Sequence, residues 1–425
     1  MMKPFRVFPI AVLLSLVCTA APLCITGCDD DDSPSTDAHQ VGVLVPLTGE
    51  VSDLGESIRA AVELAAQEIN DQALNTRHRI ELTIHDTESL PPTAAYNLNN
   101  LYDDGIRLVI GPCTSEEVSL IKTIADQNNM LMISGSATTA GLAVTGDSLM
   151  RFVVDDTAQA EVLSDKLLQD GISKIAVFYR PDIYGQGLAD ALAEAFTTVG
   201  GSVIAEYSYS RGGDQELFQT QLAELQIVVE NEQSAEPADE IGVVVVFFQE
   251  GITLLHEADA FETLDTLKWF GTDSLAKNNL LLADSQAAAF AARTGLRCSS
   301  MAAFTNDAYT AVEAQLQAQL GKDISVFAMI YYDAVHILSQ ALEQVGEADV
   351  EALKEKIREV VTEYQGATGP FELNNADDRT GPKKFDFWTV TDQDGSYGWS
   401  LESTLESSLN EDAGFRRYPQ SLLSA

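Results

Sequence analysis

The chain has 425 residues, 45% of them hydrophobic and 21% charged, a globular composition that excludes disordered, collagen-like and coiled-coil chains. One hydrophobic core rarely grows beyond about 300 residues, so we expect two domains. With 25 Lys and Arg against 65 Asp and Glu, the formal net charge is −40, and a field of that sign repels phosphate backbones and argues against nucleic-acid binding.

Residues 1–27 have the layout of a signal peptide. Two basic residues precede an apolar run, and prolines interrupt that run, which argues against a permanent membrane-spanning helix. The run ends in Ile25-Thr26-Gly27-Cys28, which resembles the lipobox of bacterial lipoproteins, a family in which the cysteine becomes the lipidated N-terminus. We therefore predict lipidation of Cys28, an acidic tether over 28–39, and a protein that faces the periplasm or the cell surface and is membrane-anchored only by this lipid. A secretory signal with an incidental cysteine is the alternative.

From residue 40 onward, apolar segments alternate with amphipathic helical segments. A first set contains predicted strands at 41–46, 79–85, 107–112 and 130–134. The pattern starts again after residue 151, with strands at 174–179, 202–207, 242–248 and 268–271. Strands rich in valine and isoleucine that are joined by helices are typical of parallel sheets covered on both faces. The sequence therefore predicts an α/β protein with two doubly wound lobes.

The last third of the chain is mainly helical. Helices are predicted at 306–320, 326–345 and 350–364, before a strand at 384–390. Only two cysteines follow Cys28, and the sequence leaves open whether Cys113 and Cys298 form a disulfide or remain buried and free.

Motifs of common enzyme classes are missing from the sequence. No G-x-S-x-G, H-E-x-x-H, P-loop or C-x-x-C motif follows residue 28. Gly185-Gln-Gly187 begins a helix after a strand, as a dinucleotide fingerprint does, but Asp190 occupies the third glycine position. We therefore predict a binding protein without catalytic activity, metal or cofactor.

A series of short segments runs through the chain in a defined order. Five of them are Val43-Leu-Val-Pro-Leu-Thr-Gly49, Ile110-Gly-Pro-Cys-Thr-Ser115, Met132-Ile-Ser-Gly-Ser-Ala-Thr138, Tyr184-Gly-Gln-Gly187 and Gly366-Ala-Thr-Gly-Pro-Phe-Glu-Leu373. In this order and spacing they resemble the periplasmic proteins that bind leucine, isoleucine and valine and serve ABC importers. The resemblance covers roughly residues 40–400.

The resemblance implies a type I periplasmic-binding fold, in which two Rossmann-like lobes are joined by three hinge crossings and hold the ligand between them. The crossings would fall near Arg151, near 300–304 and near 366–369. The implied division is 40–152 with 304–366 for one lobe, 153–303 with 367–400 for the other, and 401–425 as a C-terminal segment.

The residues themselves predict an anion site in the first of these lobes. The segment up to Ser115 connects a strand to a helix, and a helix start at the carboxyl edge of a parallel sheet suits a carboxylate. Ser136 and Thr138 follow the next strand at the same edge. By the resemblance, these three residues hold the α-carboxylate of the ligand; helix capping and turn formation alone are the alternative. The orientation of the two glutamates after Ser115 is left open.

By the resemblance, the remaining ligand contacts come from both lobes. Asp273 would pair with the ligand ammonium, which a carboxylate in a cleft holds by charge-assisted hydrogen bonds. Tyr184 and Phe248 would line the wall of the second lobe, and Phe327 an apolar wall of the first. Leu54 stands where branched-chain members usually carry an aromatic residue, so the exact ligand stays open. A solvated turn aspartate and aromatic residues that serve core packing are the alternatives.

The leading interpretation is a lipid-anchored receptor that captures an amino acid or a related small polar solute and delivers it to ABC permease subunits. A sensory protein of the same fold that signals to a chemoreceptor or kinase is the alternative. A two-lobed hydrolase is the third reading, and it would need a nucleophile and base that the sequence motifs do not supply. The choice between inner and outer membrane and the reason for the high acidity stay open.

Overall fold

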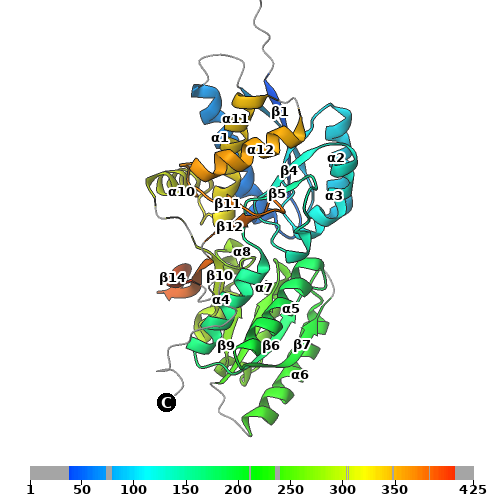
Figure 1. The fold of residues 1–425 in the computed structure, drawn as a ribbon. Helices are drawn as coiled ribbons and strands as arrows, with labels where there is room; N and C mark the ends of the chain where they lie inside the picture. Colours follow the sequence, from blue (N-terminus) through cyan, green and yellow to red (C-terminus); the bar gives the residue numbers. More distant parts are fainter. Residues whose placement is uncertain are drawn as a thin grey trace, which may run out of the picture. The chain divides into compact units, whose positions relative to one another are not determined.

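The computed structural model describes residues 38–72, 79–209, 212–234, 240–302, 304, 306–346, 349–381 and 383–406. The predicted signal peptide, Cys28 and nearly all of the predicted tether lie outside the described residues. Two large sheets organise the described chain (Figure 1). We call the part built on the five-stranded sheet the first lobe and the part built on the seven-stranded sheet the second lobe.

The first lobe contains a parallel sheet of order β2-β1-β3-β4-β5. Its strands are β1 (His39–Val45), β2 (Ile80–Asp86), β3 (Leu108–Ile110), β4 (Leu131–Ser134) and β5 (Leu149–Arg151). Alternate residues of β1 face opposite sides, so that Val43 joins one core cluster and Leu44 the other. Both faces of the sheet are therefore buried, which explains the continuous apolar runs that predicted these strands.

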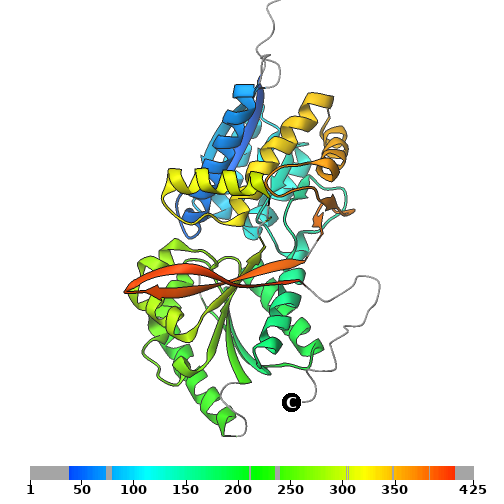
Figure 2. The same ribbon diagram turned by 90° about the vertical axis from the view of Figure 1, so that its left-hand side faces the viewer.

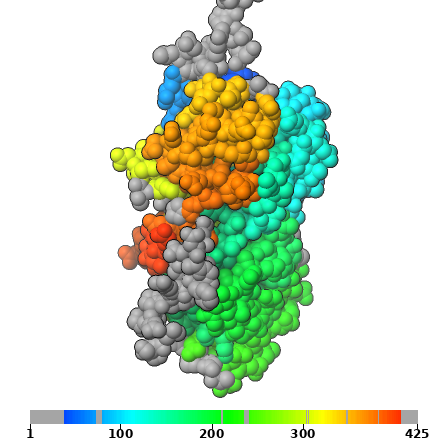
Figure 3. Space-filling view, viewed as in Figure 1, coloured from blue at the N-terminus to red at the C-terminus, as the bar shows by residue number. Residues whose placement is uncertain are grey.

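Helices cover both faces of the first sheet. One face is covered by α1 (Ser52–Gln72) and α11 (Val326–Val345), and the other by α2 (Pro91–Asp103) and α3 (Ser115–Gln127). α11 is buried almost all round because α10 (Asp307–Leu320) and α12 (Val350–Glu363) pack on its outer side. Figure 3 shows α11 and α12 in yellow and orange on the surface of this lobe. The remaining short elements are η2 (Ala140–Leu142), β11 (Glu372–Leu373) and β12 (Arg379–Thr380).

The second lobe contains a sheet of order β14-β13-β10-β9-β8-β6-β7. Its strands are β6 (Lys174–Tyr179), β7 (Ser202–Ser208), β8 (Ile241–Val246), β9 (Lys268–Gly271), β10 (Arg297–Met301), β13 (Lys384–Gln393) and β14 (Ser396–Glu406). The five strands from β6 to β10 are parallel and repeat the strand order of the first sheet. The predicted α/β fold with two doubly wound lobes is thus confirmed.

An antiparallel ribbon completes the second sheet. β13 pairs with β10 and β14 pairs with β13, both antiparallel, and the two strands form a long twisted hairpin (Figure 2). β14 runs beyond residue 400, where the sequence analysis ended its last lobe segment. The sequence did not predict β14 because polar and charged residues occupy much of this edge strand, and it did not predict β10 because Arg297-Cys-Ser-Ser-Met301 contains no β-branched residue.

Six helices cover the second sheet. α4 and α5 pack together on one face, and α6, α7 and α9 cover the other, with α8 beside α9. Their bounds are α4 (Asp156–Gln169), α5 (Ile183–Thr198), α6 (Gln215–Gln233), α7 (Glu250–Ala258), α8 (Asn279–Ala283) and α9 (Ser285–Thr294), with the short η4 (Leu264–Thr266) before β9. None of the helices in the described ranges combines the length and apolarity needed to cross a membrane.

The chain passes between the two lobes three times: between β5 and α4, between β10 and α10, and between α12 and β13. The lobe bounds that the resemblance implied stay a prediction. Cys113 and Cys298 are both buried and free, which settles the alternative that the sequence left open. Cys113 follows β3 of the first lobe, whereas Cys298 lies within β10 of the second.

Candidate functional site

Segments that follow the carboxyl ends of strands in both lobes line one pocket, which has an empty volume of about 820 Å³. In the first lobe these segments follow β1, β3 and β4, and in the second they follow β6, β8 and β9. This edge is where open α/β sheets bind their ligands. All eight residues selected from the sequence line the pocket: Leu54, Ser115, Ser136, Thr138, Tyr184, Phe248, Asp273 and Phe327.

The start of α3 differs from its predicted form. The residue that caps the helix is Thr114, whose hydroxyl accepts the Glu117 backbone N–H at 3.2 Å, while the Glu117 carboxylate accepts the Thr114 backbone N–H at 3.0 Å. Ser115 is therefore the first residue of the helix and not its cap. Glu117 is fully buried in this capping box and Glu116 is half-buried, so both glutamates have a position that the sequence could not assign.

The three hydroxyl residues of the first lobe are not equivalent. Ser115 Oγ accepts the Thr139 backbone N–H at 3.2 Å, which leaves the hydroxyl hydrogen of Ser115 for another acceptor. Ser136 already donates its hydroxyl to the carbonyl of Cys113 at 2.8 Å. Thr138 is buried and lines the pocket beside Asp273. Ser115 and Thr138 can therefore donate to a carboxylate through their hydroxyl groups, whereas Ser136 can help only by shaping the loop or through its backbone.

The second lobe presents a buried carboxylate in a polar cluster. The Tyr184 hydroxyl donates to Asp273 Oδ1 at 2.7 Å, and the hydroxyls of Thr272 and Ser274 each lie 3.0 Å from the Tyr184 hydroxyl oxygen. Burial raises the pKa of Asp273, while hydrogen bonds from Tyr184 and Gln159 lower that pKa in part. A carboxylate held in this way is destabilised when ionised and gains from a cation placed against it.

A second buried carboxylate was missed by the sequence analysis. Asp156 begins α4 and is 1% exposed, and the Thr138 hydroxyl is near enough to lower its pKa by hydrogen bonding. Burial raises the pKa of Asp156 well above its usual range, and the charges of Asp273 and Asp155 raise it further, whereas Arg151 lowers it. Asp273 lines the pocket and its charge acts on Asp156, which is not itself among the lining residues. The only sequence signal was the pair of acids at the start of a helix after the first crossing.

The remaining walls of the pocket are largely apolar. Leu54 and Phe327 contribute from the first lobe, and Phe248 and Leu280 from the second. Phe248 stacks on Tyr184 with ring centroids 5.3 Å apart and planes inclined by 7°. Phe327 is 4% exposed and also belongs to the core, so its predicted pocket role and its packing role occur together. These apolar side chains suit an uncharged ligand side chain, and charged residues line the rest of the wall, namely Glu50, Asp53, Lys277 and Asp323.

Gly185 explains the glycine-rich start of α5. A Cβ atom at this position would lie 2.2 Å from the Arg180 carbonyl oxygen and 2.4 Å from Arg180 Cγ. The glycine therefore allows the helix to approach the end of β6 closely. This packing requirement accounts for Gly185 without a nucleotide, whereas a Cβ at Gly187 would make only an ordinary contact of 3.5 Å with Thr139. Within the described ranges, no group of three or more His, Cys, Asp or Glu residues is placed to hold a metal ion.

Comparisons with known proteins identify similar chains. A family model described as Periplasmic binding protein matches residues 39–395. The leucine-, isoleucine-, valine-, threonine- and alanine-binding protein of Pseudomonas aeruginosa is 25% identical over 88% of this chain and 92% of its own length.

Solved structures show the same fold. The leucine-binding protein LivK of Thermotoga maritima aligns with a TM-score of 0.74 and 20% identity, over 86% of this chain and 98% of its own. A solute-binding protein of an ABC transporter from R. palustris, solved in complex with benzoate, aligns with a TM-score of 0.71 and 19% identity, over 90% of this chain and 100% of its own.

Proposed function

The chain belongs to the periplasmic binding protein family, and from that premise we propose that it is a solute-binding receptor that captures an α-amino acid in the pocket between its lobes and delivers it to an ABC importer. It carries out no reaction in this role. One similar protein is named for binding aliphatic amino acids and threonine, and another was solved with benzoate, so the family match alone does not select the ligand. The selection rests on the chemistry of the pocket.

The observation that carries the proposal is the polarity of the pocket across its two sides. On one side, Ser115 and the start of α3 offer hydroxyl and backbone donors to a carboxylate. On the other, Asp273 is a buried acid that forms no ion pair within the described part of the chain, and its charge acts on a second buried acid, Asp156. An α-amino acid carries both complementary charges on one carbon atom. Its carboxylate would bind the first lobe and its ammonium the acids, so that one ligand bridges both lobes and favours their closure.

A binding panel tests this proposal. Purified protein, unfolded and refolded to remove any carried ligand, is titrated calorimetrically with the twenty amino acids and with matched carboxylates that lack the ammonium. We expect an amino acid with an uncharged side chain to bind with a Kd in the micromolar range or below, and its des-amino analogue to bind at least about a hundredfold more weakly. Equal affinity for a carboxylate without the ammonium, benzoate for example, would retain the fold and reject the amino acid.

Affinity should also weaken as the pH is lowered, because the ammonium binds the ionised form of Asp273, whose charge is coupled to that of Asp156. Burial raises the pKa of both Asp156 and Asp273, so protonation of these groups competes with the ligand as the pH is lowered toward 5. The charges of the amino acid itself change little between pH 5 and 7. Calorimetry across this range should show Kd increasing as the pH falls.

The stability of the unliganded protein should change in the opposite direction, because the same two acids contribute to its free energy of unfolding. An acid whose folded pKa is raised binds its proton more readily in the folded state, so its contribution to the free energy of unfolding grows as the pH falls from the folded pKa toward the unfolded value near 4. Asp273→Asn in the same titration provides the control, because it should flatten both trends. A Kd that is independent of pH in the wild-type protein would contradict the role of the acids.

Localisation is part of the same proposal. We place the receptor on the outer side of a bacterial membrane and anchor it by a lipid on Cys28. The support is the lipobox-like sequence together with membership of a family whose members bind solutes outside the cell or in the periplasm. Cys28→Ala should release the protein from the membrane fraction in a cell fractionation experiment.

A further inference from the structure

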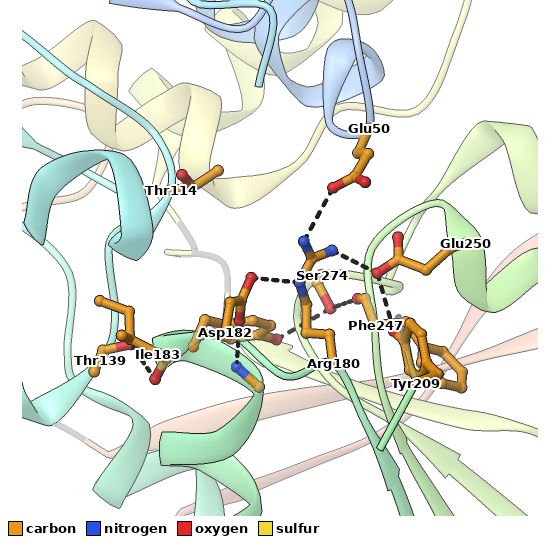
Figure 4. Close-up of polar contacts among 12 residues, drawn as sticks. Glu50, Thr114, Thr139, Arg180, Asp182, Ile183, Tyr209, Phe247, Glu250 and Ser274 are labelled. Carbon is orange, nitrogen blue, oxygen red and sulfur yellow. Dashed lines mark hydrogen bonds and ion pairs between the residues drawn. The ribbon is translucent and has the colours of Figure 1, made fainter. Parts of the chain in front are cut away.

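Arg180 lies at the centre of a buried ionic cluster behind the pocket wall (Figure 4). It follows β6, is 1% exposed, and directs each of its three nitrogens at a different carboxylate. Nε lies 2.5 Å from Asp182, Nη1 2.5 Å from Glu250, and Nη2 3.0 Å from Glu50. Tyr209 donates its hydroxyl to Glu250 at 2.9 Å.

Only one partner of Arg180 comes from the other lobe. Asp182 caps α5 and Glu250 begins α7, both in the second lobe, whereas Glu50 precedes α1 in the first lobe. The Glu50 side chain is 23% exposed, in contrast to 7% for Asp182 and 2% for Glu250. The pair of Glu50 and Arg180 is therefore the part of the cluster that must break if the lobes separate.

A second ion pair crosses the pocket with the same polarity. Lys277 follows β9 in the second lobe, and its ammonium lies 3.2 Å from Glu313 on α10 of the first lobe. In both pairs the first lobe supplies the carboxylate and the second lobe the cation. Glu50 and Lys277 both line the pocket. Lys277 has a backbone φ of +58°, in the left-handed region that favours glycine. A glycine at this position would therefore have less backbone strain than the lysine.

The charge balance indicates that the ion pair between Glu50 and Arg180 can break while the rest of the cluster stays intact. Asp182 and Glu250 already exceed the single positive charge of Arg180, and the negative charge of Glu50 contributes to the raised pKa of Glu250. Burial is the larger cause of that raised pKa. Arg180 therefore keeps its buried partners when Glu50 leaves, and the contact with Glu50, being partly exposed, is screened by salt.

The cluster also contacts the wall that faces the ligand. The Arg180 guanidinium lies 4.0 Å from the centroid of the Phe248 ring, Phe248 stacks on Tyr184, and Tyr184 donates to Asp273. A chain of direct contacts thus runs from the interlobe ion pair to the carboxylate proposed to hold the ammonium. Arg180 is a positioning residue in this arrangement, because it acts on the ligand through Phe248 and Tyr184.

We propose that the pairs Glu50–Arg180 and Glu313–Lys277 form an electrostatic latch that favours the closed arrangement of the lobes and slows ligand release. The part of the inference that concerns release rests on the proposed function. The part that concerns closure stands without any ligand. Because the latch consists of two half-buried ion pairs, it is sensitive to ionic strength.

The test uses Glu50→Gln, Glu313→Gln and the double variant, with Glu56→Gln as the matched control. Glu56 makes an ion pair of 2.8 Å with Lys322 at the same rim, but both residues belong to the first lobe. Stopped-flow fluorescence should show koff for the bound amino acid rising about two- to fivefold in each single variant and by roughly the product in the double variant. Glu56→Gln should leave koff unchanged, and added salt should accelerate release from the wild type more than from the double variant.

Closure is measured separately, on protein without ligand. Small-angle X-ray scattering at low salt should give a larger radius of gyration for the double variant than for the wild type or Glu56→Gln, and high salt should remove the difference. Equal radii for all proteins at low salt would overturn the latch. If the wild type binds no amino acid but its radius of gyration is still smaller than that of the double variant, the proposed ligand is rejected and the latch is retained. If both proteins bind the amino acid and have the same koff, the ligand is retained and the latch is rejected.

Discussion

Replacing Asp273 by asparagine should weaken amino-acid binding by at least about thirtyfold. Loss of one partner from a buried, hydrogen-bonded charge pair costs about 2–5 kcal/mol, and each 1.4 kcal/mol is tenfold in Kd. The amide of the new side chain would keep an oxygen that accepts the Tyr184 hydroxyl, so the substitution removes the charge while the local hydrogen bond can persist. Calorimetry with the best ligand of the panel measures the change.

The same variant should not lose stability, and this separates a binding role from a structural one. Burial raises the pKa of Asp273, which means that the ionised carboxylate is penalised in the folded protein at neutral pH. We therefore expect the free energy of unfolding of unliganded Asp273→Asn to equal or exceed that of the wild type in urea titrations. Asp323→Asn is the matched control, because Asp323 also lines the pocket but is only half-buried, and its Kd should stay within about threefold. Comparable losses of affinity in both variants would argue against a specific ammonium site at Asp273.

Local sequence pattern was sufficient to predict much of the fold. β6, β9 and α11 begin and end where the sequence placed them, because runs such as Ile175 to Phe178 are buried on both faces and leave no polar alternative. β10 and β14 were not predicted, because their residues carry little apolar signal and their pairing with β13 is decided by neighbours distant in the chain.

The site was predictable only in part for a similar reason. Positions such as Ser115 and Asp273 follow strands and therefore fall at the carboxyl edge of a sheet, which sequence order can indicate. Asp156 is coupled to Asp273 because the chain crosses between the lobes just before it, and Arg180 reaches Glu50 across 130 positions of sequence. Side-chain contacts between such distant residues depend on how the two lobes pack together. The spacing of residues along a short segment does not predict this packing. The single cation at the end of the apolar strand β6 was the available signal for Arg180.

Replacing Arg151 by methionine should lower the free energy of unfolding by about 3–5 kcal/mol, because it leaves a buried carboxylate without its cation. Arg151 is fully buried, and its Nε and Nη2 donate to the two oxygens of Asp378 at 2.5 and 2.7 Å. Urea unfolding of the unliganded protein measures the loss. Arg293→Met is the control, since Arg293 pairs with Asp259 and Asp265 on the surface, is 43% exposed, and should cost at most about 1 kcal/mol.

The effect of Arg151 should extend to the ligand, because the same guanidinium fixes the loop that carries Thr138. Its Nη1 donates to the carbonyls of Ala137 and Thr139 at 3.1 and 2.8 Å, one on each side of Thr138. In the double variant Arg151→Met with Asp378→Leu, an apolar pair replaces the ion pair, so much of the stability should return. Affinity should not return with it, since the two carbonyls still lack their donor and Thr138 is no longer held in place. A double variant that regains stability and full affinity together would show that Arg151 supports the fold alone and does not position the binding loop.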